Sequence, residues 1–321
     1  MKIAMMGSIH TVGWEKLKEN NCEVFEITNF ENSSLKKELA DVDGIALRTA
    51  KLSSDILSSC KKLKIISRHG VGYDNVDTIY LNQNKIALAI TGTSNSISVA
   101  EHVMTMFLYL TKKINLSDTL TKKGDFNKKH QLPDFFELYN KNILIFGFGR
   151  IGQALAKRCL GFEAKVYVHD PFVNENLIKK NNCQPISKEE GLILADYISI
   201  HLPLNNKTKN FISFEEFNKL KQQLIIVNTA RGGIINEEAL YLALKNNKIR
   251  GAGLDVFEKE PPIKNNPLFS LANIILSPHN AALTLECRKR MALELSENII
   301  YYLKKDQRLN KNNLINSNIL E

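Results

Sequence analysis

Three side chains late in the sequence have the chemistry needed to bind an acid group and exchange a proton. Arg231, Glu260 and His279 each lie shortly after a predicted strand. In an open parallel sheet the carboxyl ends of the strands meet at one edge, where ligands bind. We therefore expect these three side chains to gather at one site.

Each of the three has a plainer explanation when considered alone. An arginine such as Arg231 is more often part of a surface ion pair, and a lone histidine is usually structural. Together they suit hydride transfer from a hydroxy acid, which needs a cation for the carboxylate and a base for the hydroxyl proton. Arg231 supplies the cation, His279 the base, and Glu260 favours and orients the imidazolium. We predict this catalytic set, and no metal, because the sequence lacks histidine and cysteine clusters with ligand spacing.

A glycine-rich turn predicts a dinucleotide-binding site. After the apolar run that ends at Phe146, the sequence Gly-Phe-Gly-Arg-Ile-Gly leads into a predicted helix. The first glycine permits a tight turn, the second lets the backbone approach a pyrophosphate, and the third lets the helix pack on the strand. The helix N-terminus then offers N–H groups to the phosphates. The predicted residues of this turn are Gly147, Gly149, Arg150, Ile151 and Gly152.

An acidic residue after the next predicted strand bears on which cofactor is bound. Asp170 can accept hydrogen bonds from ribose hydroxyls and would repel the extra phosphate of NADP. No arginine or lysine follows within the next few residues, so the sequence favours NAD. The alternative is a glycine turn used only for packing, and the strand, helix and acid together weigh against it.

Short apolar runs alternating with helical patterns predict an α/β fold. This rhythm is typical of βαβ units and parallel sheets covered on both faces. Two series of runs, separated by a predicted helix at Val99–Leu116, indicate two doubly wound domains. A last helix at about Glu286–Lys304 is placed to return to the first domain, and the polar tail Asn310–Asn318 is expected to be loosely ordered. The predicted strands are Lys2–Met6, Glu23–Ile27, Gly44–Arg48, Leu63–Ser67, Ile86–Ile90, Asn142–Phe146, Lys165–His169, Tyr197–His201, Leu224–Asn228, Gly253–Val256 and Ile274–Leu276.

Composition argues against several other classes of protein. No apolar run reaches the roughly 18 residues that cross a bilayer, and the N-terminus lacks the pattern of a signal peptide. Five scattered cysteines favour a reduced, cytoplasmic protein without a zinc site. The formal net charge of +9 comes from lysines dispersed in polar segments. It predicts a solvated surface that attracts an anionic substrate and no nucleic-acid site.

Several motifs in one order resemble the D-isomer-specific 2-hydroxyacid dehydrogenase family, which includes 3-phosphoglycerate, glycerate and D-lactate dehydrogenases. The resemblance runs from about Arg48 to His279. It rests on residues 68–77, 92–95, 99–102 and 201–204, on the glycine turn, and on the three late segments.

The resemblance implies two α/β domains, a flavodoxin-like substrate domain and a Rossmann NAD domain, with a cleft between them. We expect the substrate domain at residues 1–94 plus 286–321 and the NAD domain at residues 95–285. The family also implies a homodimer formed through the NAD domains. Because the chain ends near residue 321, we expect no C-terminal regulatory domain and no serine feedback.

The resemblance also assigns residues to the ligands. The further cofactor residues it implies are His201, Pro203, Thr229, Ala230 and Asp255, the last beside the nicotinamide carboxamide. The substrate residues it implies are Arg48, Arg68, Gly70, Val71, Gly72 and Asn95. The two arginines suit a phosphate or second acid group, although either could be a surface charge, so 3-phosphoglycerate and glycerate or hydroxypyruvate are the candidate substrates.

Two rival functions share this pattern. The resemblance extends to NAD(H)-sensing corepressors, which keep the fold and the catalytic residues. It also extends to phosphite dehydrogenases and to formate dehydrogenases, although the latter have glutamine where Glu260 stands. One departure from the family is that the segment before the glycine-rich strand has no tryptophan, since the only one is Trp14.

Overall fold

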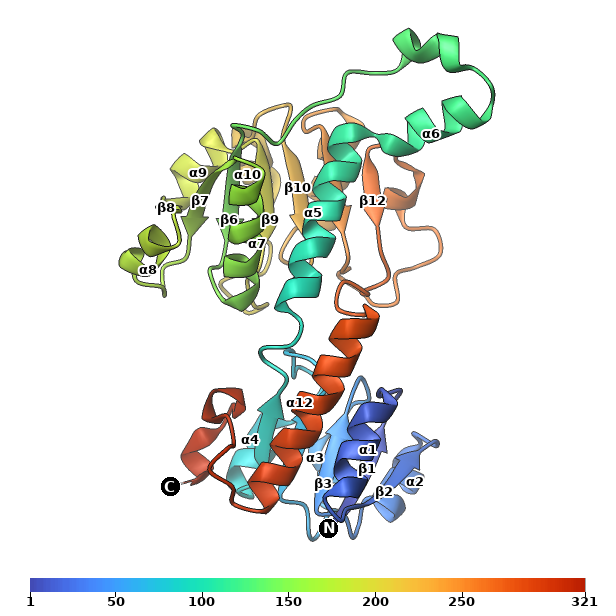
Figure 1. Ribbon diagram of the computed structural model, residues 1–321, viewed down its shortest axis with the longest axis vertical. Helices are drawn as coiled ribbons and strands as arrows, with labels where there is room; N and C mark the ends of the chain where they lie inside the picture. The colour runs from blue at the N-terminus through green and yellow to red at the C-terminus, as the bar shows by residue number, and fades with distance from the viewer. Residues whose placement is uncertain (321) are drawn as a thin grey trace. The chain divides into compact units, whose positions relative to one another are not determined.

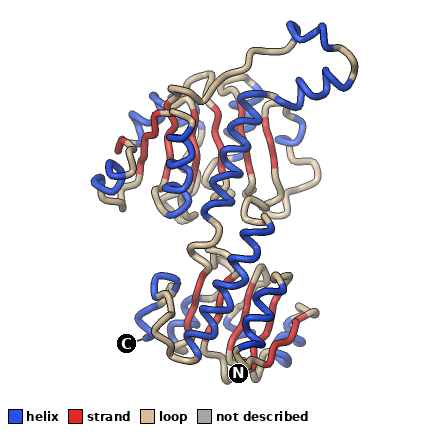
Figure 2. Tube along the Cα trace, viewed as in Figure 1, coloured by secondary structure: helices blue, strands red, loops and turns tan. Residues whose placement is uncertain are grey.

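Two parallel sheets organise the chain. The computed structural model describes residues 1–320, and these divide into unit 1, residues 1–95 with 283–320, and unit 2, Ser96–Ala282. Figure 1 labels the elements, and Figure 2 distinguishes the strands of each unit from the helices over them. The predicted α/β class with two doubly wound sheets is confirmed.

The sheet of unit 1 has five parallel strands in the order β2-β1-β3-β4-β5. This is the flavodoxin-like order, which reverses direction beside β1. The helix α12 (Leu285–Leu303) belongs to unit 1 and packs against α1 and β4. The strands are β1 (Lys2–Met6), β2 (Glu23–Ile27), β3 (Gly44–Leu47), β4 (Ile65–Arg68) and β5 (Ala87–Ile90), and the other helices are α1 (Thr11–Glu19), α2 (Asn32–Glu38), α3 (Ser54–Leu57) and α4 (Thr78–Gln83), with short η3 (Lys311–Asn313) and η4 (Ser317–Leu320).

The sheet of unit 2 has seven parallel strands in the order β12-β11-β10-β9-β6-β7-β8. Its first six strands along the chain follow the Rossmann order, and β12 extends that sheet by one strand. The strands are β6 (Asn142–Phe146), β7 (Lys165–His169), β8 (Gln184–Pro185), β9 (Tyr197–Ile200), β10 (Ile225–Asn228), β11 (Gly251–Leu254) and β12 (Ile274–Leu276). The helices are α5 (Ser96–Lys112), α6 (Ile114–Lys122), η1 (Phe126–Gln131), α7 (Arg150–Gly161), α8 (Glu175–Lys180), α9 (Lys188–Leu194), α10 (Phe214–Lys219), α11 (Glu237–Lys245) and η2 (Pro267–Ser270).

The central strands of unit 2 are mainly apolar on both faces, although Asn142, Ser199 and Asn228 are polar, because helices cover both faces of the sheet. Strand β6 shows this alternation directly. Ile143 and Ile145 belong to one buried cluster, whereas Leu144 and Phe146 belong to the cluster on the other face. Successive side chains of a strand point to opposite faces, so one run of residues supplies both cores.

The helix predicted at Val99–Leu116 is divided in the structure. Helix α5 ends at Lys112, Lys113 takes a left-handed backbone with φ of 44°, and α6 begins at Ile114. Neither α6 nor η1 contains a buried residue, and Figure 1 shows this segment extending away from the sheet of unit 2. The amphipathic pattern identified the helix but not the turn that redirects the chain.

The tail predicted to be loosely ordered is docked on β5 instead. The side chain of Asn316 accepts from the backbone N of Leu88 at 2.8 Å and donates to the backbone O of Ile86 at 3.0 Å. Asn313 is 1% exposed and donates to Glu294 and Asn298. The expectation was wrong because buried asparagine side chains replace the hydrogen bonds that an edge strand would otherwise lack.

Residues 1–320 contain neither a candidate membrane-spanning helix nor a candidate metal-binding cluster. No helix in this range combines the length and the apolar character that would let it cross a bilayer. The same residues hold no group of three or more histidine, cysteine, aspartate or glutamate side chains placed to bind a metal ion.

Candidate active site

The glycine turn of unit 2 leaves open space where a side chain would otherwise stand. Gly147 has a φ of 92°, and a Cβ there would lie 2.5 Å from the backbone O of His201. A Cβ at Gly152 would lie 2.2 Å from the backbone O of Gly147, whereas at Gly149 it would meet nothing within 4 Å. Two glycines are thus required by packing, and the third leaves the N-terminus of α7 uncovered, as a phosphate cradle requires.

Asp170 lies beside this turn at the end of β7. One oxygen of its carboxylate, Oδ2, accepts from the backbone N of Phe148 at 2.8 Å, and the other, Oδ1, accepts from Phe172 N at 2.9 Å. Each oxygen keeps a lone pair beyond these bonds. The carboxylate is therefore fixed next to the glycine turn and can still accept hydrogen bonds from a ribose.

Residues 201–203 follow β9 and approach the same turn through the backbone. The ring Nε2 of His201 lies 2.9 Å from the Ser199 hydroxyl, and its Nδ1 is buried without a hydrogen-bond partner. Burial lowers the pKa of His201 to about 3, so the ring is neutral at neutral pH. Pro203 is exposed, and the predicted cofactor contacts of this segment stay predictions.

Strand β10 delivers Thr229, Ala230 and Arg231 to the same edge of the sheet. The Asn228 side chain closes their turn, since it accepts from Ala230 N at 3.0 Å and donates to Arg231 O at 2.8 Å. The hydroxyl oxygen of Thr229 is buried and has no hydrogen-bond partner in the protein. A buried orphan hydroxyl at a strand end suits a ligand contact there.

The turn bearing Arg231 is packed onto the loop bearing Glu260. A Cβ at Gly232 would lie only 1.8 Å from the backbone O of Phe257, so the two backbones are in direct contact. The Phe257 N–H in turn donates to Glu260 Oε1 at 3.1 Å. Two of the three predicted catalytic residues are therefore carried by contacting loops.

The second oxygen of Glu260 reaches the third predicted residue. Glu260 Oε2 lies 2.8 Å from His279 Nδ1, and the two side chains are 39% and 51% exposed. A carboxylate only accepts, so Nδ1 carries the proton in this pair and Nε2 is left for chemistry. Both residues line a pocket of about 350 Å³ whose walls also include Phe257, Phe269 and Leu276.

Asp255 anchors the turn that carries His279. Its carboxylate is 1% exposed and accepts from Ser277 Oγ at 2.6 Å, Asn280 N at 2.9 Å and Ala281 N at 3.0 Å. His279 itself has a φ of 51°, a backbone that few residues other than glycine adopt without support from their surroundings. The predicted contact of Asp255 with a carboxamide stays a prediction, whereas its hold on this turn is a feature that the sequence did not reveal.

The predicted substrate residues lie in unit 1, at the carboxyl ends of its strands. Arg68 donates to the backbone O of Gly72 at 2.8 Å and of Leu47 at 3.0 Å, so it supports the Gly70–Gly72 loop. Arg48 makes a long hydrogen bond of 3.4 Å to Ser8 O. The Val71 side chain is exposed.

Asn95 is the last residue of the first segment of unit 1, and it carries another buried polar atom without a hydrogen-bond partner. Its side chain is 9% exposed, and its Oδ1 is buried without a partner in the protein. An unsatisfied buried carbonyl oxygen costs free energy unless a donor reaches it. This is compatible with the predicted ligand contact of Asn95, which stays a prediction.

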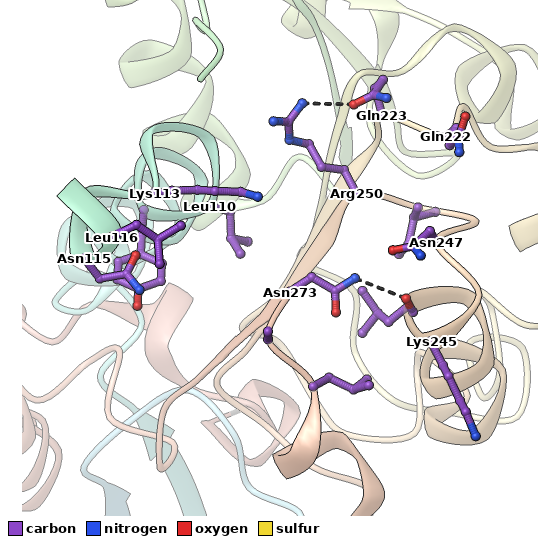
Figure 3. A pocket seen from close by; sticks show the side chains of 15 residues that line it. Leu110, Lys113, Asn115, Leu116, Gln222, Gln223, Lys245, Asn247, Arg250 and Asn273 are labelled. Atoms are coloured by element: carbon purple, nitrogen blue, oxygen red, sulfur yellow. Dashed lines mark hydrogen bonds between the residues drawn. The ribbon is translucent and has the colours of Figure 1, made fainter. Parts of the chain in front are cut away.

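A pocket larger than the one at Glu260 and His279 lies elsewhere in unit 2. A hollow of about 580 Å³, shown in Figure 3, is lined by Gln223, Arg250 and Asn273, which precede β10, β11 and β12. It therefore opens at the amino ends of these strands, and none of the predicted site residues lines it. The chemistry of the side chains, rather than cavity volume, identifies the carboxyl edge as the candidate site.

The donors and spaces at this edge fit a dinucleotide. Gly149 leaves room over a helix N-terminus, Asp170 keeps acceptors for a ribose, and Thr229 holds an orphan hydroxyl. The Glu260–His279 pair lies at the end of neighbouring strands of the same sheet. This edge of the sheet thus carries both a space suited to a dinucleotide and a carboxylate–imidazole pair able to exchange a proton.

Comparison with known proteins gives the same picture. Residues 104–281 match the family model "D-isomer specific 2-hydroxyacid dehydrogenase, NAD binding domain". A hydroxypyruvate reductase of Thermotoga maritima is 38% identical over 286 residues, 87% of this chain and 91% of the relative. A D-3-phosphoglycerate dehydrogenase of Archaeoglobus fulgidus is 34% identical over 301 residues, 94% of this chain, but the chain spans only 57% of that relative.

A solved structure extends the likeness to the whole fold. The D-lactate dehydrogenase of Aquifex aeolicus, complexed with NAD and lactic acid, superposes with a TM-score of 0.85 at 28% identity and covers 98% of both chains. The family model, the relatives and the fold agree with the motifs in the sequence. The chain therefore belongs to the D-isomer specific 2-hydroxyacid dehydrogenase family.

Proposed function

We propose that this chain is an NAD-dependent dehydrogenase that interconverts a small anionic D-2-hydroxy acid and its 2-keto acid. The observation that carries the proposal is the 2.8 Å pair between His279 Nδ1 and Glu260 Oε2, located on the same sheet edge as the glycine turn. That pair is the acid–base group that hydride transfer from an alcohol requires.

The residues of unit 2 divide the reaction between them. Bound nicotinamide supplies the acceptor or donor of the hydride. His279 takes the hydroxyl proton at Nε2 during oxidation and returns it during reduction. Glu260 holds the ring through Nδ1 and stabilises the imidazolium that forms. Arg231 binds the carboxylate and polarises the keto oxygen with its guanidinium.

The cofactor preference is assigned to Asp170. Its carboxylate is held beside the glycine turn by two backbone N–H groups, so it cannot easily turn away from a 2′-phosphate. Like charges at hydrogen-bonding distance repel strongly. We therefore propose NAD rather than NADP as the working cofactor, with Arg150, Ile151, His201, Pro203 and Ala230 as further contacts on the family resemblance.

The substrate is proposed to be 3-phosphoglycerate, or glycerate with hydroxypyruvate as its keto form. The support is the likeness to a hydroxypyruvate reductase and to a phosphoglycerate dehydrogenase. On the resemblance, the residues proposed to contact the substrate are Arg48, Arg68, Gly70, Val71, Gly72 and Asn95.

An NADH-coupled screen tests the activity and the substrate together. The panel pairs hydroxypyruvate with phosphohydroxypyruvate, and adds pyruvate, glyoxylate and, in the oxidative direction, phosphite. Turnover of at least one 2-keto acid is the expected result, and the ratio within the phosphate pair ranks the two candidate substrates. Tight NADH binding with no turnover across the panel would contradict the enzyme and favour a sensor of the corepressor type.

We further propose that the chain forms a homodimer through unit 2. The support is the segment from α6 through η1, which has no buried residue and exposes Ile114 at 60% and Phe126 at 63%. Large exposed apolar side chains on an extended segment are typical of an interface. Light scattering on the purified protein should give twice the chain mass of 36.4 kDa, and a monomer mass would contradict the proposal.

A further inference from the structure

The turn from Ser277 to Ala281 is supported by helix α5, none of whose residues has a role in the proposed reaction. Besides Asp255, helix α5 contacts this turn at both of its ends. Ser98 Oγ donates to the backbone O of Ala281 at 2.7 Å, and His102 Nε2 lies 2.9 Å from Ser277 Oγ. Ser98 and His102 are four residues apart, so they lie on one face of the helix, one turn from each other. His279 lies between the two points that α5 holds.

The proton on His102 can be assigned by counting donors. Ser277 has one hydroxyl proton, and the 2.6 Å contact with Asp255 Oδ1 takes it, because a carboxylate has none to give. The Ser277 oxygen must then accept from His102, whose Nε2 carries a proton. His102 therefore donates to the Ser277 hydroxyl, and the Ser277 hydroxyl donates to the Asp255 carboxylate.

This relay ends on a buried carboxylate that depends on protein donors, and His102 Nε2 itself lies 3.9 Å from Asp255 Oδ1. Asp255 is 1% exposed, so water does not stabilise its charge, and its donors are Ser277 and the N–H groups of Asn280 and Ala281. Removing one donor from a buried carboxylate weakens the rest of its network. The N–H groups of Asn280 and Ala281 follow His279 directly, and the left-handed backbone of His279 depends on their being held.

We propose that His102 is a positioning residue for the acid–base group: by donating to Ser277 it fixes Asp255, and Asp255 fixes the turn that presents the His279 ring to Glu260. His102 does not touch the reacting atoms. The inference rests on the proposed function for its kinetic consequence, but its structural content, that His102 controls the geometry at His279, is independent of any turnover.

Two substitutions of His102 distinguish the loss of its hydrogen-bond donor from the loss of the ring itself. His102→Leu removes the donor, whereas His102→Gln keeps an N–H at similar reach. Thr105→Ala is the matched control, since Thr105 lies on the exposed side of α5 and bonds only to Glu101 O within the helix. Thermal unfolding of all three variants identifies any that lose their fold, and Ser277→Ala, which removes the middle of the relay, repeats the test at a second residue.

The first measurement needs neither cofactor nor substrate. In the NMR spectrum of the free protein, the ring resonance of His279 is identified as the one that is absent from the spectrum of His279→Gln. We expect His102→Leu and Ser277→Ala to displace or broaden it, and His102→Gln and Thr105→Ala to leave it in place. An unmoved resonance in His102→Leu, or equal displacement in His102→Leu and His102→Gln, overturns the inference.

The second measurement is steady-state kinetics on the best substrate of the screen. We expect His102→Leu to lower kcat roughly tenfold or more, because displacement of a reacting group by a fraction of an ångström is costly. The KM for substrate and the binding of NADH should change little, and His102→Gln should restore kcat. Wild-type kcat in His102→Leu overturns the inference, whereas a wild-type protein without turnover overturns the proposed function and leaves the resonance measurement to decide the inference.

Discussion

The carboxyl ends of the two parallel sheets are used in different ways. In unit 2 the Glu260–His279 pair is formed, about half exposed, and leaves Nε2 of the ring for chemistry. In unit 1 the Arg68 side chain donates to two backbone carbonyls of its own neighbourhood, and the ring of His69 is buried with its Nε2 unpartnered. The same topological position thus holds a half-exposed carboxylate–imidazole pair in one unit and, at Arg68 and His69, groups engaged with local structure in the other.

This difference between the two sheet edges predicts whether a substitution in each unit should change activity or stability. Changes at the strand ends of unit 2 remove groups proposed to act on ligands, so they should alter turnover or cofactor choice. Changes at Arg68 and His69 of unit 1 affect groups bound up with local structure, so they should alter stability whatever they do to substrate binding. Four substitutions, one of them with a matched control, test this division.

The largest effect is expected at His279. His279→Ala should lower kcat about 10²- to 10⁴-fold, the usual contribution of a positioned acid–base group. NADH binding, followed by its fluorescence, should persist, because the ring is not part of the glycine turn. Unchanged turnover would remove His279 from the reaction and with it the contrast between the two units.

The acid stability of unit 1 should depend on His69. Burial, followed by the charge of Arg48, lowers the pKa of His69 to about 4 from 6.5. Between these values the unfolded chain binds the proton and the folded chain does not, so stability is complete above pH 6.5 and falls as the pH approaches 4. The loss should be about 3 kcal/mol.

Urea unfolding between pH 8 and pH 4 measures that dependence. His69→Gln cannot titrate, so its free energy of unfolding should fall less steeply with acid than that of the wild type. Identical slopes for the two proteins would show that His69 is not buried in its neutral form.

Arg68 should contribute to stability and Arg48 should not. Arg68→Gln leaves the carbonyls of Leu47 and Gly72 without their charged donor, which should cost about 1–3 kcal/mol of unfolding free energy. Arg48→Gln is the matched control, because its one hydrogen bond is 3.4 Å long. Equal destabilisation by both substitutions would contradict the assignment of Arg68 to loop support.

The smallest expected effect concerns the choice of cofactor. Asp170→Ala removes the charge beside the glycine turn and should reduce the NAD preference over NADP by roughly tenfold, equivalent to about 1.4 kcal/mol. The ratio of kcat/KM for the two cofactors measures it. An unaltered ratio would count against a ribose contact at Asp170.

Much of the fold was predictable because parallel strands carry a strong signal. Continuous apolar runs located the strands of both sheets, and β1, β2, β6, β7 and β12 have the predicted bounds. The two-residue β8 was missed, since a run of that length has no pattern. The break at Lys113 was missed because a left-handed lysine between two helical patterns leaves no signature in composition.

The candidate site was predictable to the level of individual side chains but not of their supports. The Glu260–His279 pair could be anticipated, since their types fit one reaction and both follow strands. Ser277 and His102 lie in segments that carried the family resemblance, but neither was given a role, because a serine and a helical histidine have many ordinary roles. Their signal lies in three-dimensional contacts between segments far apart in the chain, which a single sequence does not display.

The contact at Gly232 sets a limit on how this protein can be engineered. Even a methyl group there would overlap the Phe257 carbonyl oxygen, so a fully randomised codon screened for turnover should return glycine alone. Grafting the arginine loop or the glutamate loop from a relative, one without the other, would need the same fit of backbone to backbone. Recombination experiments should therefore exchange the two loops together.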